Sequence, residues 1–171
     1  MNMQVLTLNK PNITNFSSER NKLMENVESQ WILFLDKDES ISNSQFPISN
    51  QFSSYQFLRK NFFLGKYIGN DILIRLVKKG TGKWVRAVHE IWQPKKTHLV
   101  GVIKDSFIIH NTADSLSNYI NKINNYSTLH AKANFDEGKK ATLFKIIFFP
   151  IVKFIITLIK SRNIVIVIME L

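Results

Sequence analysis

The pattern of apolar and polar positions changes its period along the chain, and the first fifty residues already show both periods. Val5–Leu8 has the length of a short strand. Asn15–Gln30 carries an apolar stripe at helical spacing, with Ser17 or Ser18 as the expected N-terminal cap. Trp31–Leu35 is an unbroken apolar run, which predicts a strand covered on both faces. A helix followed directly by a buried strand is typical of α/β folds, so we predict an α/β architecture.

The rest of the chain alternates between strand and helix signals. Residues 40–54 are polar and include a proline, so they predict a loop. The block from Tyr55 to about His110 is rich in strand-forming residues and carries a turn signal at Lys79–Gly82. From Asp114 onwards the apolar spacing becomes helical. The apolar positions of this helix are Leu116, Tyr119, Ile120, Ile123 and Tyr126.

Residues 141–160 are apolar enough to suggest a membrane segment. On a helical wheel, however, Lys145, Lys153 and Lys160 fall on one side and leave a wide apolar arc. A lysine near the middle of a bilayer costs about 2.5–3.5 kcal/mol, and Pro150 interrupts the hydrogen-bond ladder. We therefore expect helices that are broken near Pro150, lie in the membrane interface and expose an apolar face. A helix buried against the rest of the domain is the alternative.

The composition of the chain limits its chemistry and the kinds of partner that it can bind. The chain has 171 residues, 44% of them hydrophobic, which is enough for one folded domain with a core. It has no cysteine, which excludes disulfides and thiolate chemistry. A net charge of +10 favours anionic partners such as nucleic acid, anionic lipid or a phosphorylated substrate. A basic nucleic-acid-binding module stays open as an alternative, but the basic residues are dispersed and the aromatic residues lie in apolar runs.

An acidic cluster follows the apolar run that ends at Leu35. Asp36 and Asp38 point to the same face if the strand continues, because side chains alternate with a period of two. Ligands of open α/β sheets bind at the carboxyl ends of strands, and paired carboxylates there hold Mg²⁺ or Mn²⁺. A solvated acidic turn is the alternative for so short a motif.

Five stretches occur in an order that resembles the family-2 glycosyltransferases, specifically bacterial lipopolysaccharide core-sugar transferases. They are Ser17–Asn21, Trp31–Glu39, Phe57–Lys66, Ile74–Glu90 and Ile108–Ala133, and the resemblance covers about residues 12–160. It implies an incomplete, Rossmann-like GT-A domain over residues 1–138. Residues 139–171 would then form a C-terminal amphipathic segment at the membrane interface.

The resemblance also implies roles for residues on the donor side of a site. Asp38 would ligate a divalent metal, Asp36 would reach the ribose or share the metal, and His110 would be a third ligand. An imidazole ligand suits Mn²⁺ better than Mg²⁺. Arg20 would contact phosphate or hold Asp36 in place, with a surface salt bridge as the alternative. Lys37 departs from the small residue that is usual between the two aspartates.

On the acceptor side, the resemblance points to His89 and Glu90. Glu90 would be the general base that takes the proton of the acceptor hydroxyl. His89 would orient it or contact the acceptor; without the resemblance, His89 reads as a structural histidine.

The implied activity is a metal-dependent, inverting transfer of sugar. The donor would be a nucleotide-diphosphate sugar, and the acceptor a lipid-linked, lipopolysaccharide or other cell-envelope glycan. The protein would sit peripherally on the cytoplasmic face of the inner membrane through residues 141–160, with no nucleic acid partner. The family's N-terminal base-binding unit and its C-terminal pattern are not matched, which suggests a fragment. An inactive fragment or a membrane-associated pseudoenzyme is therefore an alternative.

Overall fold

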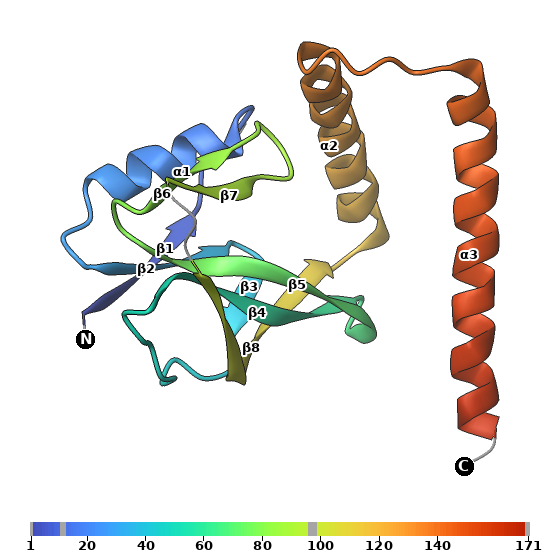
Figure 1. Ribbon diagram of the computed structural model, residues 1–171. Coiled ribbons are helices and arrows are strands. Elements are labelled where there is room, and N and C mark those ends of the chain that lie inside the picture. Colours follow the sequence, from blue (N-terminus) through green and yellow to red (C-terminus); the bar gives the residue numbers. More distant parts are fainter. Residues whose placement is uncertain (1, 11–12, 96–98, 170–171) are drawn as a thin grey trace. The chain divides into compact units, whose positions relative to one another are not determined.

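The computed structural model describes residues 2–10, 13–95 and 99–169, and within the last helix it describes side chains as far as residue 156. The chain divides into two units, Met1–Ala133 and Asn134–Leu171. The strands are β1 (Met3–Leu8), β2 (Trp31–Asp36), β3 (Glu39–Ile41), β4 (Phe52–Phe63), β5 (Lys66–Lys78), β6 (Gly82–Val85), β7 (Ile91–Pro94) and β8 (Leu99–Ala113) (Figure 1). The helices are α1 (Phe16–Glu25), α2 (Leu116–Asp136) and α3 (Leu143–Met169).

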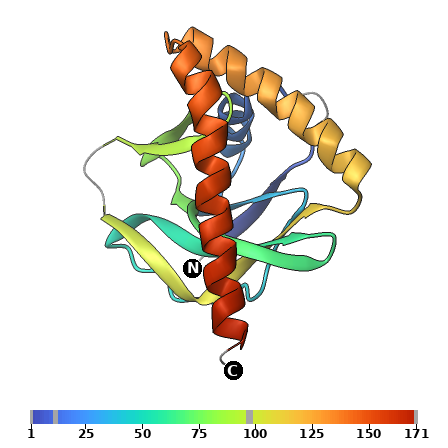
Figure 2. The same cartoon turned by 90° about the vertical axis from the view of Figure 1, so that its right-hand side faces the viewer.

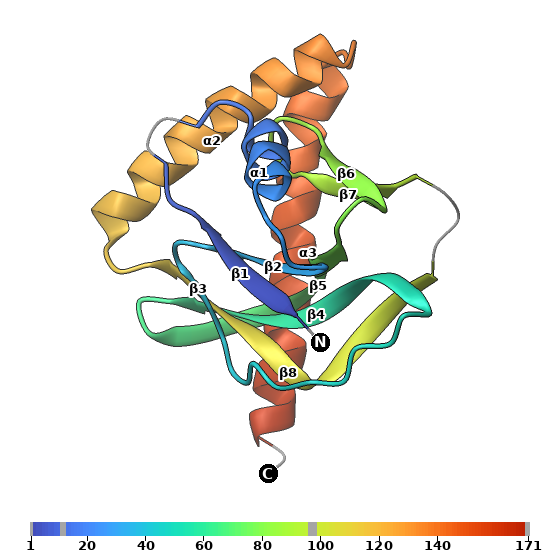
Figure 3. The same ribbon diagram turned by 90° about the vertical axis from the view of Figure 1, so that its left-hand side faces the viewer.

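The first unit is built on a curled mixed sheet, which confirms the predicted α/β class and is compatible with a Rossmann-like domain. Its strand order is β1-β2-β5-β4-β8-β3. The pairs β1–β2 and β4–β8 are parallel, and the other neighbours are antiparallel. A separate hairpin, β6–β7, lies beside α1 (Figure 3).

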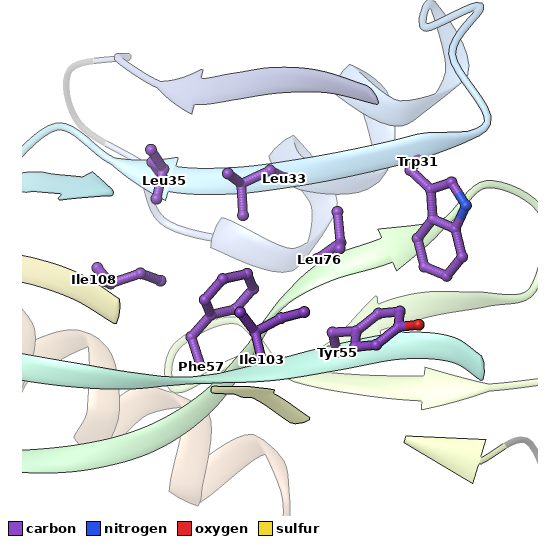
Figure 4. Close-up of a cluster of buried hydrophobic side chains, with 8 residues drawn as sticks. All are labelled: Trp31, Leu33, Leu35, Tyr55, Phe57, Leu76, Ile103 and Ile108. Atoms are coloured by element: carbon purple, nitrogen blue, oxygen red, sulfur yellow. The ribbon is translucent and has the colours of Figure 1, made fainter. Parts of the chain in front are cut away.

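Strand β2 lies in the core, as its apolar run predicts. Trp31, Leu33 and Leu35 belong to one cluster of buried side chains, and Figure 4 shows them pointing toward the side chains of β4, β5 and β8. Ile32 and Phe34 belong to a second cluster, on the face covered by α1 and the β6–β7 hairpin. Burying each such side chain contributes about 1.5–3 kcal/mol, so the alternation fixes this strand between two layers.

Helix α1 is shorter than the sequence predicts and has a different cap. The Asn15 side chain, rather than Ser17 or Ser18, accepts a hydrogen bond from a backbone amide of the first turn. The helix ends at Glu25 instead of continuing to Gln30. This helix end is stabilised from far along the chain, because the Lys79 ammonium donates to the carbonyls of Glu25 and Val27.

The predicted loop at 40–54 is only partly a loop. Strand β3 reaches Ile41 and pairs with β8, placing Glu39 opposite His110, and β4 begins at Phe52. A strand of three residues is too short to show a period, so its pairing with β8 decides it. The turn predicted at Lys79–Gly82 is confirmed, with Gly80 at a φ of +83°.

Helix α2 follows β8 as predicted, and only part of its apolar stripe is covered. The Tyr119 ring packs edge-on against Phe63, with ring centroids 4.8 Å apart. The Tyr126 ring stacks on Phe16 at 5.6 Å. Leu116, Ile120 and Ile123 are exposed, and Tyr126, which is 39% exposed, is covered only in part. The covered side of the helix is thus the side that carries the two tyrosines.

The second unit contains α3, which runs through Pro150 as one helix (Figures 1 and 2). The predicted break near Pro150 is therefore wrong. A proline removes one hydrogen-bond donor and bends a helix, but the apolar turns on both sides keep the rest of the ladder. The exposed apolar side chains include Phe144, Ile147, Phe148, Phe154 and Ile155. Among the described residues, no helix combines the length and apolarity needed to cross a membrane.

Candidate active site

A cleft of about 1370 Å³ opens in the first unit where β2 ends. Its walls come from the β2–β3 turn, strands β5 and β8, the segment before β7, and α2. Five of the six predicted site residues line it: Asp36, Asp38, His89, Glu90 and His110. The structure thus brings the residues assigned to the donor side and to the acceptor side into one cavity.

The sixth residue, Arg20, lies behind the cleft wall and joins its two sides. Its side chain is 1% exposed; Nη2 donates to Oδ1 of Asp36 at 2.6 Å, and Nε donates to Oε1 of Glu90 at 2.8 Å. The guanidinium also lies 5.3 Å from the ring centroids of Phe34 and Trp84. Arg20 therefore holds Asp36, and the alternative of a surface salt bridge is wrong because the group is buried.

The second oxygen of Asp36 begins a chain of alternating charges. Arg75 Nη2 donates to Asp36 Oδ2 at 2.6 Å and to Glu39 Oε1 at 2.8 Å. Arg59 Nη1 donates to the same oxygen of Glu39 at 2.8 Å, and its other nitrogens hold Asp71. Burial opposes ionisation of Asp36, but the charges of Arg75 and Arg20 outweigh it and lower the pKa of Asp36. Asp36 is thus a fixed carboxylate with both oxygens engaged.

Asp38 has different surroundings, because it lies in the two-residue turn between β2 and β3. Its Oδ2 lies 3.4 Å from His110 Nε2 and 2.5 Å from Lys122 Nζ, and its carbonyl accepts from the Asn111 amide at 2.9 Å. Burial opposes ionisation, but the bonds from His110 and Lys122 prevail and hold the pKa of Asp38 well below its usual range. Asp38 is therefore ionised at neutral pH.

The donor atoms near Asp38 fit a divalent cation in part. His110 Nδ1 lies 2.7 Å from Asn61 Oδ1, and in the neutral tautomer protonated at Nδ1 the ring donates to this oxygen. In that tautomer Nε2, which faces Asp38 in the ligand-free protein, would be free to bind a cation. Two ligands about 2.1 Å from one ion stand about 3.0–3.4 Å apart, which suits Asp38 Oδ2 and His110 Nε2. Asp36 does not join them, since arginines occupy its oxygens. Over the described residues there is no group of three or more His, Asp or Glu side chains that could hold a metal, so this pair would bind a free cation only weakly and would need a ligand's phosphates to complete the coordination.

Helix α1 also fixes the segment that carries His89 and Glu90. The Asn21 side chain exchanges two hydrogen bonds of 2.9 Å with the backbone of Trp84, and the Phe16 amide donates to the carbonyl of Ala87 at 2.8 Å. His89 has a left-handed φ of +54°, which is unusual for a side-chain-bearing residue and is common at functional sites.

The α2 wall contributes groups that the sequence pattern does not single out. The His130 ring meets the His89 ring edge-on, with centroids 4.7 Å apart. Partial burial and the charges of Asp36, Glu90 and Asp38 raise the pKa of Tyr126 to about 12. The Tyr126 hydroxyl is therefore a neutral hydrogen-bond donor facing an acidic cleft.

Other site residues missed by sequence reasoning are Arg59, Arg75, Glu39 and Lys122. Arg75 gives the one usable signal, because it interrupts an apolar run that predicts a buried strand. A charge at such a position needs a buried partner. Lys122 gives no signal, since a lysine on a helix is ordinarily solvated.

Comparison with known proteins gives one distant relative. No protein-family model matches the chain. It is 23% identical over 154 residues to a protein named "Lipopolysaccharide core biosynthesis glycosyltransferase LpsC" from Rhizobium meliloti (strain 1021). The alignment covers 82% of this chain and 56% of that protein, so the chain spans about half the relative's length. This similarity supports a glycosyltransferase relationship.

Proposed function

We propose that this chain is the sugar-donor-binding part of a family-2, GT-A-type glycosyltransferase that acts on a lipopolysaccharide or lipid-linked glycan. The observation that carries the proposal is the single cleft lined by Asp36, Asp38 and Glu90, with Arg20 joining Asp36 to Glu90. The similarity to a named lipopolysaccharide core glycosyltransferase supports this reading.

On the donor side, Asp38 and His110 would hold Mn²⁺ or Mg²⁺ together with the two phosphates of the nucleotide sugar. When bound, such a cation supplies Lewis-acid stabilisation of the leaving diphosphate. Asp36 is held by two arginines at the carboxyl end of β2 and keeps about a third of its side chain exposed to the cleft. It would accept hydrogen bonds from the ribose hydroxyls of the donor.

On the acceptor side, Glu90 would take the proton of the attacking hydroxyl. Arg20 binds one oxygen of Glu90 and thereby fixes the orientation of a side chain that is 14% exposed. A base across the cleft from the diphosphate suits a single displacement with inversion. His89 is exposed at the cleft and would contact the acceptor.

The acceptor would approach from a membrane surface. Helix α3 exposes apolar side chains beside Lys145 and Lys153, which suits a helix lying in the interface of an anionic membrane. The proposed location is the cytoplasmic face of the inner membrane, peripherally bound.

The test measures donor binding and transfer separately. The purified chain is titrated with a panel of nucleotide-diphosphate sugars in Mn²⁺, and release of nucleoside diphosphate is followed with lipopolysaccharide core acceptor. We expect Glu90→Gln to keep donor binding and to lose about 10²–10⁴-fold in transfer, the range for a general base. Asp38→Asn should lose Mn²⁺-dependent donor binding. Glu28→Gln, at an exposed position outside the cleft, is the matched control and should change neither.

Two results would count against the proposal. One is a wild-type chain that binds no member of the donor panel with or without Mn²⁺. The other is transfer that survives in Glu90→Gln at the wild-type rate.

A further inference from the structure

Lys122 lies in the candidate donor site, beside Asp38. It lies on α2, lines the cleft, and donates from Nζ to Asp38 Oδ2 at 2.5 Å and to the Thr112 carbonyl at 3.4 Å. Its side chain is 36% exposed, and that of Asp38 is 31% exposed. The ion pair therefore faces the cleft.

Lys122 differs from the arginines of the same cleft in how firmly it is held. Arg75 joins Asp36 to Glu39, and Arg59 joins Glu39 to Asp71, so each guanidinium is fixed by two carboxylates. Lys122 binds one carboxylate through a compact ammonium on a flexible stem. It can turn away from Asp38 by changing rotamers, without disturbing the arginine network.

The same oxygen of Asp38 faces both Lys122 and His110. Asp38 Oδ2 is 2.5 Å from Lys122 Nζ and 3.4 Å from His110 Nε2. A divalent cation held between Asp38 and His110 would take the place of the ammonium on this oxygen. Two positive charges cannot share it at such distances without strong repulsion. Cation binding therefore requires Lys122 to leave Asp38.

We infer that Lys122 is a donor-binding residue with two alternative partners. In the ligand-free protein it neutralises Asp38. When a divalent cation occupies Asp38 and His110, Lys122 pairs instead with the phosphates that accompany that cation. The identity of the phosphates rests on the proposed function. The competition between the Lys122 ammonium and a divalent cation at Asp38 does not.

The experiment uses the full chain and two probes. Mn²⁺ alone is titrated by electron paramagnetic resonance, and UDP, GDP and CDP are then titrated calorimetrically in saturating Mn²⁺. Lys122→Met removes the ammonium and keeps the length of the stem. We expect it to bind Mn²⁺ roughly fivefold more tightly, the upper range for a partly exposed ion pair. We also expect it to bind the preferred nucleoside diphosphate roughly tenfold more weakly, as for loss of one charge-assisted phosphate contact.

Two further variants keep the result interpretable. Lys132→Met makes the same change at an exposed position of α2 outside the cleft and should leave both affinities unchanged. Lys122→Arg keeps the charge and should stay within about twofold of wild type in Mn²⁺ binding. It shows that a change in Lys122→Met follows from charge and not from misfolding.

Each outcome is decisive. Equal or weaker Mn²⁺ binding by Lys122→Met overturns the competition, and so does a wild-type chain that binds no Mn²⁺. Unchanged nucleoside-diphosphate affinity in Lys122→Met overturns the phosphate role. If wild type binds Mn²⁺ but none of the three diphosphates, the proposed function and the phosphate role fail, while tighter Mn²⁺ binding by Lys122→Met still establishes the competition.

Discussion

Replacing Arg20 by methionine should destabilise the first unit strongly, because one buried cation serves two carboxylates. Arg20 donates to Asp36 at 2.6 Å and to Glu90 at 2.8 Å, and its own side chain is 1% exposed. Methionine has a similar stem and fills most of the volume against the rings of Phe34 and Trp84. The substitution thus removes charge with little loss of packing.

The expected magnitude follows from what each carboxylate retains. Removing one partner of a buried ion pair costs about 3–5 kcal/mol, because the remaining charge is left without compensation. Asp36 is a third exposed and keeps Arg75, so water and one guanidinium recover part of the loss. Glu90 is 14% exposed and recovers less. We expect the free energy of unfolding to fall by about 3 kcal/mol, a large share of the 5–15 kcal/mol typical of a domain.

Urea unfolding followed by tryptophan fluorescence measures this loss. Lys22→Met, on the same helix with a 65% exposed side chain, is the matched control and should change stability by less than about 0.5 kcal/mol. Adding Glu90→Gln to Arg20→Met should restore part of the loss, because it removes the uncompensated charge. A loss below about 1 kcal/mol for Arg20→Met, or no recovery in the double variant, would refute the reasoning.

Three further predictions concern other parts of the chain. The lowered pKa of Asp38 contributes stability that is present above the ordinary aspartate pKa and is lost as pH falls below it. In Asp38→Asn, the free energy of unfolding measured in urea should therefore fall less between roughly pH 5 and pH 2 than it does in the wild type. Gly101→Ala should cost about 1–3 kcal/mol in the same assay, because its Cβ would overlap the Tyr55 ring, whereas Val102→Ala, at a 52% exposed position, should be nearly neutral. The full chain should float with anionic liposomes, and deletion of residues 141–171 should abolish flotation. Each lysine near the membrane surface adds about 1 kcal/mol to the binding free energy. Equal flotation of the full and the shortened chain would contradict an interfacial role.

Local patterns predict the parts of the fold that local contacts decide. The unbroken apolar run of β2 predicts a strand between two layers, and both faces of β2 are buried. The end of α1 could not be predicted in the same way, since it depends on Lys79, more than fifty residues away. Strand β3 likewise exists because it pairs with β8. The break expected at Pro150 treated a proline as a stop where the helix continues.

In the candidate site, too, some residues could be predicted from the sequence and others could not. Asp36, Asp38, Glu90 and His110 are recognisable because they occur in motifs, and they line one cleft. Their partners are not recognisable, because an ion pair between distant segments leaves no period in the sequence. Lys122, for example, meets a carboxylate 84 residues away. Motifs can therefore predict which groups gather, but not which of their oxygens are already occupied.

The occupied oxygens bear on why this cleft would need a metal at all. Its continuous network sets three guanidiniums, those of Arg20, Arg59 and Arg75, against four carboxylates, those of Asp36, Glu39, Asp71 and Glu90. Asp38 and Lys122 likewise pair with each other. Because the arginines of this network already pair with carboxylates, they add little attraction for a diphosphate donor. Under the proposed function, a divalent cation bound to the donor would make the incoming complex nearly neutral, and the Lys122 ammonium displaced from Asp38 would add a positive charge on the phosphate side. On this argument the arginines would hold the carboxylates in place, and the charge that favours the donor would come from the cation and Lys122.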